Sequence, residues 1–357
     1  MLTSKKLWLG VLVSALFLVL FLFGIDFPDT GAALKSANYL YVIPAVAVYF
    51  GSLVFRALRW QYILRNLRLI PLRRLYAATV VGYMANNVLP VRLGEVAKAY
   101  YLGQREKVSA TSTLATVGIE RIYDGITLMF VLLVIWPFLP LGELFQNDSG
   151  DLLWVRAGIG VLLVAAFFGA IVTFVAVAFR PELGRRLTDI IVFFVPGRFK
   201  GQVGNLAELF IGGLESLNSP RKLLGIFVLS IPVWIMESLM YYLITFSFDL
   251  DVPFSLALAV TATSNLVGAI PAAPGNVGTF EWATKVTLVS FGHNAEVSVA
   301  YAATLHLTLW LPVVIAGIIY MWTQHRSLME LTRIRPVAVG ADGDPVGPVP
   351  LERKGEK

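Results

Sequence analysis

Long apolar stretches recur along this chain of 357 residues and constrain its fold more than any other feature. A helix needs roughly 20 apolar residues to cross the hydrocarbon core, where every backbone N–H and C=O must find an internal partner. Only 15% of the residues are charged, whereas a soluble domain has about 25%. We therefore predict an all-α polytopic membrane protein with about six transmembrane helices, at about 7–25, 39–58, 109–137, 152–179, 223–248 and 296–322.

Two further apolar regions, about 71–104 and 253–292, are interrupted by residues that break helices. Proline and glycine divide each region into pieces of roughly 10–18 residues, most of which are too short to span a bilayer. We predict two re-entrant helical hairpins, each entering and leaving on one side. The residues expected to break them are Pro90 and Gly94 in the first hairpin, and Pro271, Pro274, Gly275 and Gly278 in the second.

The charges of the connecting segments predict the orientation. With both interrupted regions treated as hairpins, basic segments such as 59–74, 105–107 and 180–222 share one side, whereas acidic residues such as Asp26 and Asp249 lie on the other. By the positive-inside rule the basic side is cytoplasmic. We predict a cell (inner) membrane location with both termini in the cytoplasm, the first hairpin opening to the cytoplasm and the second to the outside.

The order of these segments also predicts an internal repeat. Helix, hairpin and helix at about 39–137 recur at about 223–322, and the single helix between the copies inverts the second, as in some transporters. Residues 1–335 would form one integral membrane domain. The linker 180–222 reads as amphipathic helices on the cytoplasmic leaflet, and 336–357 reads as a disordered cytoplasmic tail.

Ionisable residues inside predicted spans are the sharpest functional signal, because charge in a bilayer is costly. Glu120, Arg121 and Asp124 share one span, where Arg121 can pair with Asp124 three residues on. Glu237 and His306 lie within two others and are candidates for carrying protons. The alternative for all five is a structural role in tying helices together.

The first hairpin adds a cation beside a helix N-terminus. Arg92 precedes the second half of the hairpin, and such an arrangement suits a phosphate group. Lys98 would contribute a second positive charge, or pair with Glu95 one turn away. Arg92 and Lys98 could instead be anchors that reach the membrane interface.

Three other groups of charges have simpler interpretations. Backbone amides around Asn276 could bind an anion, and Glu281 with Lys285 suggests an internal ion pair. Arg56 and Arg59, with Trp60, are interpreted as anchors at the cytoplasmic interface.

Enzyme signatures are scarce. The sequence has no cysteine and three histidines without metal-ligand spacing, and it contains no HExxH, GxSxG or Walker motif. We predict no catalytic activity, no metal and no cofactor. Asp249 and Asp251 leave a sugar-transferase interpretation open, although acidic outer loops are ordinary.

Four motifs resemble one known family: Arg56–Trp60, Asn86–Glu95, Glu120–Asp124 and Pro271–Glu281 are similar to the transmembrane region of lysylphosphatidylglycerol synthases. This family is also called flippase-like or UPF0104, and the resemblance covers about residues 5–325. In the two-domain synthases this region is associated with moving an aminoacylated phospholipid between leaflets, and a soluble domain makes that lipid. The resemblance therefore implies lipid translocation without aminoacyl transfer.

The expected function is a bacterial or archaeal lipid translocase for an anionic, phosphate-bearing lipid: a phospholipid, an aminoacyl-phospholipid or a polyprenyl-linked lipid. Alternatives are a membrane-embedded enzyme or scaffold of lipid or glycolipid synthesis, and a small-solute transporter. Expected partners are the lipid, a second copy of the chain, and lipid- or glycan-synthesising enzymes, with no nucleic acid. The predicted substrate-binding residues are Asn86, Asn87, Arg92, Glu95, Lys98, Glu120, Arg121, Asp124, Asn276 and Glu281.

Overall fold

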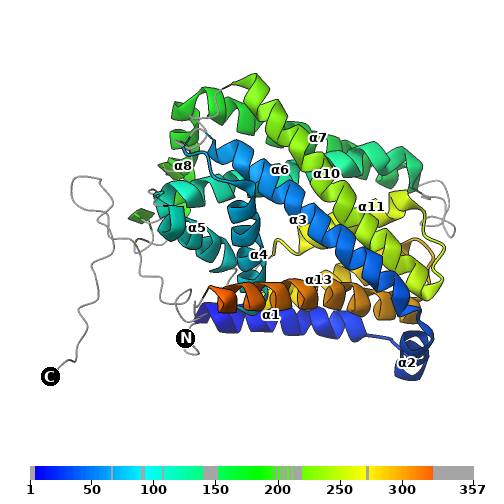
Figure 1. The fold of residues 1–357 in the computed structure, drawn as a ribbon. Coiled ribbons are helices and arrows are strands. Elements are labelled where there is room, and N and C mark those ends of the chain that lie inside the picture. Colours follow the sequence, from blue (N-terminus) through cyan, green and yellow to red (C-terminus); the bar gives the residue numbers. More distant parts are fainter. Residues whose placement is uncertain are drawn as a thin grey trace.

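Helices make up the architecture (Figure 1). The computed structural model describes residues 5–324 apart from 66, 90–92, 107, 140–151, 196, 198–199, 202–203, 205–206, 209–210, 212–218 and 271–272, and contains no strand within them. The α-helices are α1 (Lys5–Leu22), α2 (Phe27–Ser36), α3 (Val42–Leu64), α4 (Leu72–Val88), α5 (Leu93–Glu106), α6 (Ala110–Ile135), α7 (Leu152–Phe179), α8 (Pro181–Phe194), α10 (Pro220–Thr245), α11 (Phe254–Val267), α12 (Thr279–Ser290) and α13 (Ala295–Thr323).

Each of the six predicted spans corresponds to a helix. Among the described residues, three helical segments are long and apolar enough to cross a membrane: Tyr39–Leu64, Pro220–Phe248 and Ala295–Thr323. Counting the bent pairs α1–α2, at 86°, and α7–α8, at 117°, raises the number to five. The remaining long helix, α6, has 26 residues and so extends about 39 Å, but it carries Glu120, Arg121 and Asp124. The fold is that of an all-α polytopic membrane protein.

Helices α3 and α10 pack side by side in opposite directions at the centre of the fold (Figure 1). Before α3, the Asn38 N–H donates to the Ser247 carbonyl beyond the end of α10, at 2.8 Å. At the other end, a Cβ added to Gly225 near the start of α10 would lie 2.6 Å from the Tyr62 hydroxyl. Small residues at such positions let membrane helices approach closely.

The two interrupted regions fold as pairs of short helices, α4–α5 and α11–α12, and the members of each pair pack together. Between α11 and α12 lies a 3₁₀ turn, η6 (Pro274–Asn276), in which Gly275 and Asn276 adopt positive φ, as does Gly278 just after it. Glycine adopts this conformation without a steric penalty, which explains the break. Pro90, Arg92 and Pro271 lie outside the described residues, and re-entry from one side of the bilayer stays a prediction.

The order of elements repeats as the sequence predicts. A long helix, a short pair and a long helix occur as α3, α4–α5, α6 and again as α10, α11–α12, α13. The opposite directions of α3 and α10 are consistent with an inverted relation, which stays a prediction. In the linker, α8 exposes Leu183, Leu187, Ile190 and Phe193, and the predicted disordered tail lies outside the described residues.

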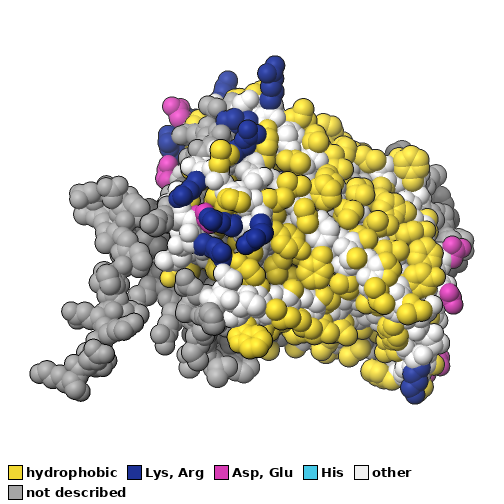
Figure 2. Space-filling view, viewed as in Figure 1, with side chains coloured by type: hydrophobic (Ala, Val, Ile, Leu, Met, Phe, Trp, Pro, Cys, Tyr) yellow, Lys and Arg dark blue, Asp and Glu magenta, His cyan; other side chains and the backbone are white. Residues whose placement is uncertain are grey.

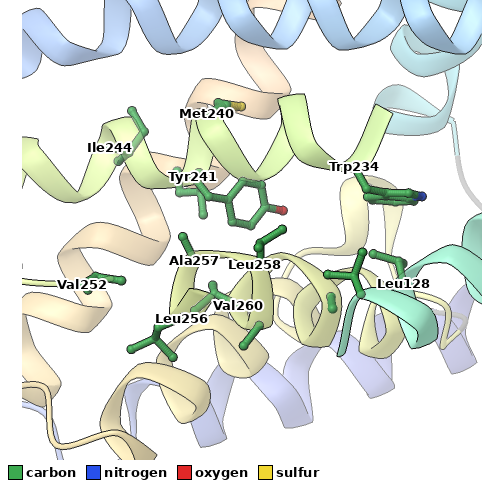
Figure 3. Packing of buried hydrophobic residues seen from close by; sticks show 14 of the residues in the cluster. Leu128, Trp234, Met240, Tyr241, Ile244, Val252, Leu256, Ala257, Leu258 and Val260 are labelled. Atoms are coloured by element: carbon green, nitrogen blue, oxygen red, sulfur yellow. The ribbon is translucent and has the colours of Figure 1, made fainter. Parts of the chain in front are cut away.

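The largest apolar core buries α11 against α10 and α6 (Figure 3). Trp234 and Tyr241 of α10, Leu128 of α6, and Leu256 and Leu258 of α11 belong to one cluster. The Tyr301 hydroxyl of α13 donates to the Tyr241 carbonyl at 2.9 Å. This packing holds the first helix of the second hairpin inside the bundle.

Charge is divided between the two ends of the molecule. Figure 2 shows most Lys and Arg side chains gathered at one end with a few acidic ones among them, a broad apolar surface in the middle, and mainly acidic side chains with one basic side chain at the other end. Exposed cations at the basic end include Arg65, Arg68, Arg73, Arg74 and Arg105, and exposed acids at the opposite end include Asp26, Asp29, Asp249 and Asp251.

Candidate functional site

Six ionisable side chains from four helices meet inside the bundle and are each at least 95% buried. We call them the charged cluster: Arg56 and Arg59 of α3, Lys98 of α5, Glu120 and Asp124 of α6, and Glu237 of α10. Spacings of three and four residues place the two members from α3 on one face, and likewise the two from α6. Burying a charge is costly unless it is paired, so the pairing within the cluster decides what it can do.

Glu120 and Asp124 of α6 are paired with cations from both neighbouring helices. Lys98 Nζ lies 2.6 Å from Glu120 Oε2, and Arg59 Nη1 lies 2.7 Å from Asp124 Oδ1. Arg59 Nη2 also lies 3.6 Å from Glu120 Oε1. The Lys98 ammonium sits 3.8 Å from the centre of the Trp60 ring, a cation–π contact. The first hairpin is thereby tied to α3 and α6.

Glu237 extends the cluster to α10. Arg56 Nη2 lies 2.5 Å from Glu237 Oε2 and Arg56 Nη1 lies 3.7 Å from Asp124 Oδ2. The Asn265 amide of α11 donates to Glu237 Oε1 at 3.3 Å. The Arg56 guanidinium also lies over the rings of Trp234 and Tyr83.

A less buried ion pair adjoins the cluster. Arg121 Nη2 lies 3.2 Å from Asp124 Oδ2, as the sequence predicts, and Arg121 Nε lies 3.5 Å from Glu95 Oε1. The Arg121 side chain is 38% exposed and the Glu95 side chain 26% exposed. Arg121 is thus the accessible cation of this group, and Glu95 is its accessible counter-ion.

The pairing is balanced in charge. The cluster has three cations and three carboxylates, and Arg121 with Glu95 adds one of each. A second anion beside Arg121 would leave an uncompensated negative charge in a medium of low dielectric constant. On this balance, Glu95 is the carboxylate that an anionic group at Arg121 would replace.

The tips of the two hairpins meet at α13, in what we call the hairpin junction: Asn87, Gly275, Glu281, His306 and Trp310. Trp310 Nε1 donates to the Asn87 carbonyl at the end of α4, at 3.2 Å. A Cβ added to Gly275 would lie 3.1 Å from Trp310 Cδ1 and 3.7 Å from the Asn87 oxygen. His306 Nδ1 lies 2.5 Å from Glu281 Oε1. The two broken regions therefore lie next to each other in the structure.

Helix α1 closes over the second hairpin. Ser14 Oγ donates to the Val277 carbonyl at 2.7 Å and accepts from the Ala273 N–H at 2.8 Å. Lys285 Nζ donates to the Phe21 and Phe23 carbonyls at the end of α1. A lysine at these carbonyls satisfies groups that the helix end leaves free.

Most of the predicted site residues within the described part of the chain fall into two groups. Glu95, Lys98, Glu120, Arg121, Asp124 and Glu237 belong to the charged cluster or its rim, whereas Asn87, Glu281 and His306 belong to the junction. Asn86 packs against Gly94 within the first hairpin, and Asn276 lies in η6.

Several sequence-based interpretations were wrong. Arg56 and Arg59 are buried ion-pair partners, not interface anchors. Lys98 pairs with Glu120 instead of Glu95, and Glu281 pairs with His306 instead of Lys285. A count of charges could have found the arginines: three carboxylates within spans need more cations than Arg121 alone.

The sequence is similar to a protein family and to several individual membrane proteins. A family model described as "Lysylphosphatidylglycerol synthase TM region" matches residues 7–317. A UPF0104 membrane protein of Methanothermobacter thermautotrophicus is 28% identical over 75% of this chain and 80% of its own length. A UPF0104 membrane protein of Pyrococcus horikoshii is 20% identical over 91% of this chain and 98% of its own.

A third relative is named for an activity. "Glycosyltransferase AglD" of Haloferax volcanii is 25% identical over 86% of this chain, which spans 52% of that protein. The residues matched by the family model include every member of the charged cluster and of the hairpin junction. The chain therefore belongs to the family of the lysylphosphatidylglycerol synthase transmembrane region.

Proposed function

We propose that this membrane protein moves a phosphate-bearing lipid between the two leaflets of the bilayer, without chemical change to the lipid. Family membership supports a role close to lipids. Phospholipids, aminoacyl-phospholipids and polyprenyl-linked lipids all carry the phosphate that the proposal requires. The headgroup would pass through the bundle while the acyl chains stay in the surrounding lipid.

The observation that carries the proposal is the Arg121–Glu95 pair. Arg121 is held by Asp124 at 3.2 Å and keeps an exposed fraction of 38%. A guanidinium is the preferred partner of phosphate, since it donates two parallel hydrogen bonds. A headgroup phosphate that displaces Glu95 substitutes one negative charge for another, so the buried cluster stays neutral. Arg92, outside the described residues, is proposed as a second phosphate ligand.

The proposed location is the cell membrane, with the basic end of the molecule in the cytoplasm. The separation of exposed cations and acids in Figure 2 supports this orientation under the positive-inside rule. The Arg121–Glu95 pair would then be reached through the first hairpin from the cytoplasmic side.

Reconstitution tests the proposal. Vesicles containing the protein and fluorescent phosphatidylglycerol are treated with an impermeant quencher to follow the labelled headgroup between leaflets. Arg121→Ala is expected to slow translocation by about 10–100-fold, corresponding to a loss of roughly 1.4–2.8 kcal/mol of phosphate interaction. Arg186→Ala, which removes an exposed arginine of α8, is the matched control. Unchanged translocation in folded Arg121→Ala protein would contradict the site.

The similarity to the protein named glycosyltransferase AglD favours one second candidate, a role in lipid-linked glycan synthesis. Incubation with radiolabelled lipid followed by thin-layer chromatography separates the two proposals. A new lipid species would indicate an enzyme, whereas redistribution of unchanged lipid would indicate a translocase. Mass spectrometry of co-purified lipid would identify the cargo.

A further inference from the structure

His306 is an ionisable side chain, 12% exposed, that the proposed phosphate site does not use. It lies about 17 Å along α13 from the first residue of that helix. Both ring nitrogens are engaged: Nε2 lies 2.8 Å from the Gly275 carbonyl oxygen, and Nδ1 lies 2.5 Å from Glu281 Oε1. Glu281 Oε2 accepts from the Gly278 N–H at 2.7 Å.

These contacts determine how many hydrogen atoms the His306 ring and the Glu281 carboxyl group carry between them. A carbonyl oxygen only accepts, so His306 Nε2 carries a hydrogen. Between Nδ1 and Oε1 one hydrogen is needed, whether it resides on the imidazole or on the carboxyl group. Without it, a nitrogen lone pair would face a carboxylate lone pair at 2.5 Å, and the contact would break. The pair is therefore held together by a single dissociable proton.

The same pair holds the tip of the second hairpin. His306 binds the Gly275 carbonyl and Glu281 binds the Gly278 N–H, which lie on either side of the break before α12. Gly275 in turn lies against Trp310, whose indole binds the Asn87 carbonyl of the first hairpin. A change at His306 is thus connected to the contact between both hairpins.

Neighbouring charged groups have partners elsewhere. Lys285 of α12 donates to carbonyl groups of α1, and Glu237 of α10 pairs with Arg56. Tyr241 of α10 lies near Ser264 and Asn265, and Tyr83 of α4 lies under Arg56. Asp29 of α2 and Glu296 of α13 belong to the first turns of their helices, the latter about 15 Å from His306 along α13. Among the described residues, Glu281 carries the carboxyl group that is paired with His306.

We propose that His306 and Glu281 form a proton-binding site that latches the second hairpin, and that the proton is the coupling ion of lipid movement. With the proton bound, the pair is neutral overall and the latch is closed. Loss of the proton to water leaves neutral His306 beside a carboxylate and frees the tip, which lets the two hairpins separate. The coupling part rests on the proposed function, whereas the proton site does not.

Two measurements test the proton site without lipid transport. Nitrogen-15 NMR of histidine-labelled protein in nanodiscs reports the hydrogens on His306, assigned by its loss in His306→Gln. Hydrogen–deuterium exchange, corrected for intrinsic rates, reports opening of 273–281 at about pH 5.5 and about pH 8. Wild-type opening is expected to increase about tenfold at the higher pH, because proton loss breaks the latch.

Glu281→Gln is the informative variant. The glutamine amide can donate to His306 Nδ1 and its oxygen can accept from Gly278, so the latch persists without a dissociable proton. Its exchange in 273–281 should be insensitive to pH, whereas His293→Gln should behave as wild type. An unprotonated Nδ1 facing ionised Glu281 throughout the pH range, or a Glu281→Gln variant with wild-type pH dependence, would overturn the proton site.

Vesicles with an imposed pH gradient test the coupling with the same fluorescent phosphatidylglycerol. The gradient should drive accumulation of the labelled lipid in one leaflet for wild type and not for Glu281→Gln. Translocation unaffected by the gradient would overturn the coupling. If the protein moves no lipid at any pH while NMR and exchange show the latch, the proposed function fails and the proton site stands.

Discussion

Arg56 joins two helices whose contacting residues lie 181 positions apart in the sequence. Its guanidinium lies between Glu237 of α10 and Asp124 of α6, and over the rings of Trp234 and Tyr83. The arginine and its carboxylate partners depend on one another, because removing either side leaves an uncompensated charge buried away from water.

Arg56→Met is expected to destabilise the protein by about 3–5 kcal/mol, since it leaves Glu237 buried and unpaired. The double variant with Glu237→Leu should recover much of that loss. Thermal unfolding in detergent, followed by the soluble monodisperse fraction, measures both, and Arg65→Met at the exposed end of α3 is the control. A double variant no more stable than Arg56→Met would contradict the pairing.

The carboxylates of the charged cluster were recognisable from the sequence, but not all of their partners were. Glu120, Asp124 and Glu237 are conspicuous because each interrupts an apolar span. Arg56 and Arg59 lie near the end of such a span, where arginine is usually an interface anchor. Pairings within one helix, such as Arg121 with Asp124, follow from spacing, whereas Lys98 with Glu120 depends on how α5 packs on α6.

The close packing of helices α4 and α5 in the first hairpin depends on two glycines where the helices cross. A Cβ on Gly94 would lie 2.3 Å from Asn86 N and from Gly82 O, both backbone atoms. A Cβ on Gly82 would lie 2.9 Å from Lys98 Cβ. This close approach places Lys98 beside Glu120.

Gly94→Ala is expected to destabilise the protein by about 1–3 kcal/mol, because the added methyl group meets backbone that cannot move aside. The same thermal assay measures the change. Gly169→Ala on α7 is a matched control, since a Cβ there meets nothing within 4 Å; its helix propensity should make it neutral or slightly stabilising. Equal stability of the two variants would refute the tight crossing.

Both hairpins were predictable as elements. Both interrupted regions contain residues that a lipid-facing helix excludes, and the structure has helix pairs there. Gly94 was expected to break the first hairpin but lies in the first turn of α5, because α4 ends at Val88 and α5 begins at Leu93. The meeting of Trp310 with Asn87, and of His306 with Glu281, was not predictable, because α13 gives no local sign of its partners.

At the scale of the whole molecule, the two ends differ in charge while an apolar band lies between them (Figure 2). Helix α1 also contacts the second hairpin, which is distant in sequence, through the hydrogen bond from Ser14 to the Val277 carbonyl. The difference in charge between the ends supports the orientation proposed above.

The absence of cysteine makes this orientation testable. Single cysteines introduced by Arg73→Cys and Arg186→Cys should react with an impermeant maleimide from the cytoplasmic side, and those from Lys35→Cys and Asp249→Cys from the opposite side. Right-side-out and inverted vesicles provide the two exposures. Reaction of Arg73→Cys and Asp249→Cys from the same side would exclude the proposed topology.

The class of protein, the helical segments, the two interrupted regions and the carboxylates of the charged cluster could all be read from the amino-acid sequence. These follow from transfer energies and helix geometry, which act locally along the chain. The packed helices add three facts: which charges neutralise one another, that Arg121 and Glu95 remain partly exposed, and that His306 meets Glu281 beside the hairpin tips. Such pairings are selected by packing between distant helices, where the cost of an unpaired charge requires each one to find a partner.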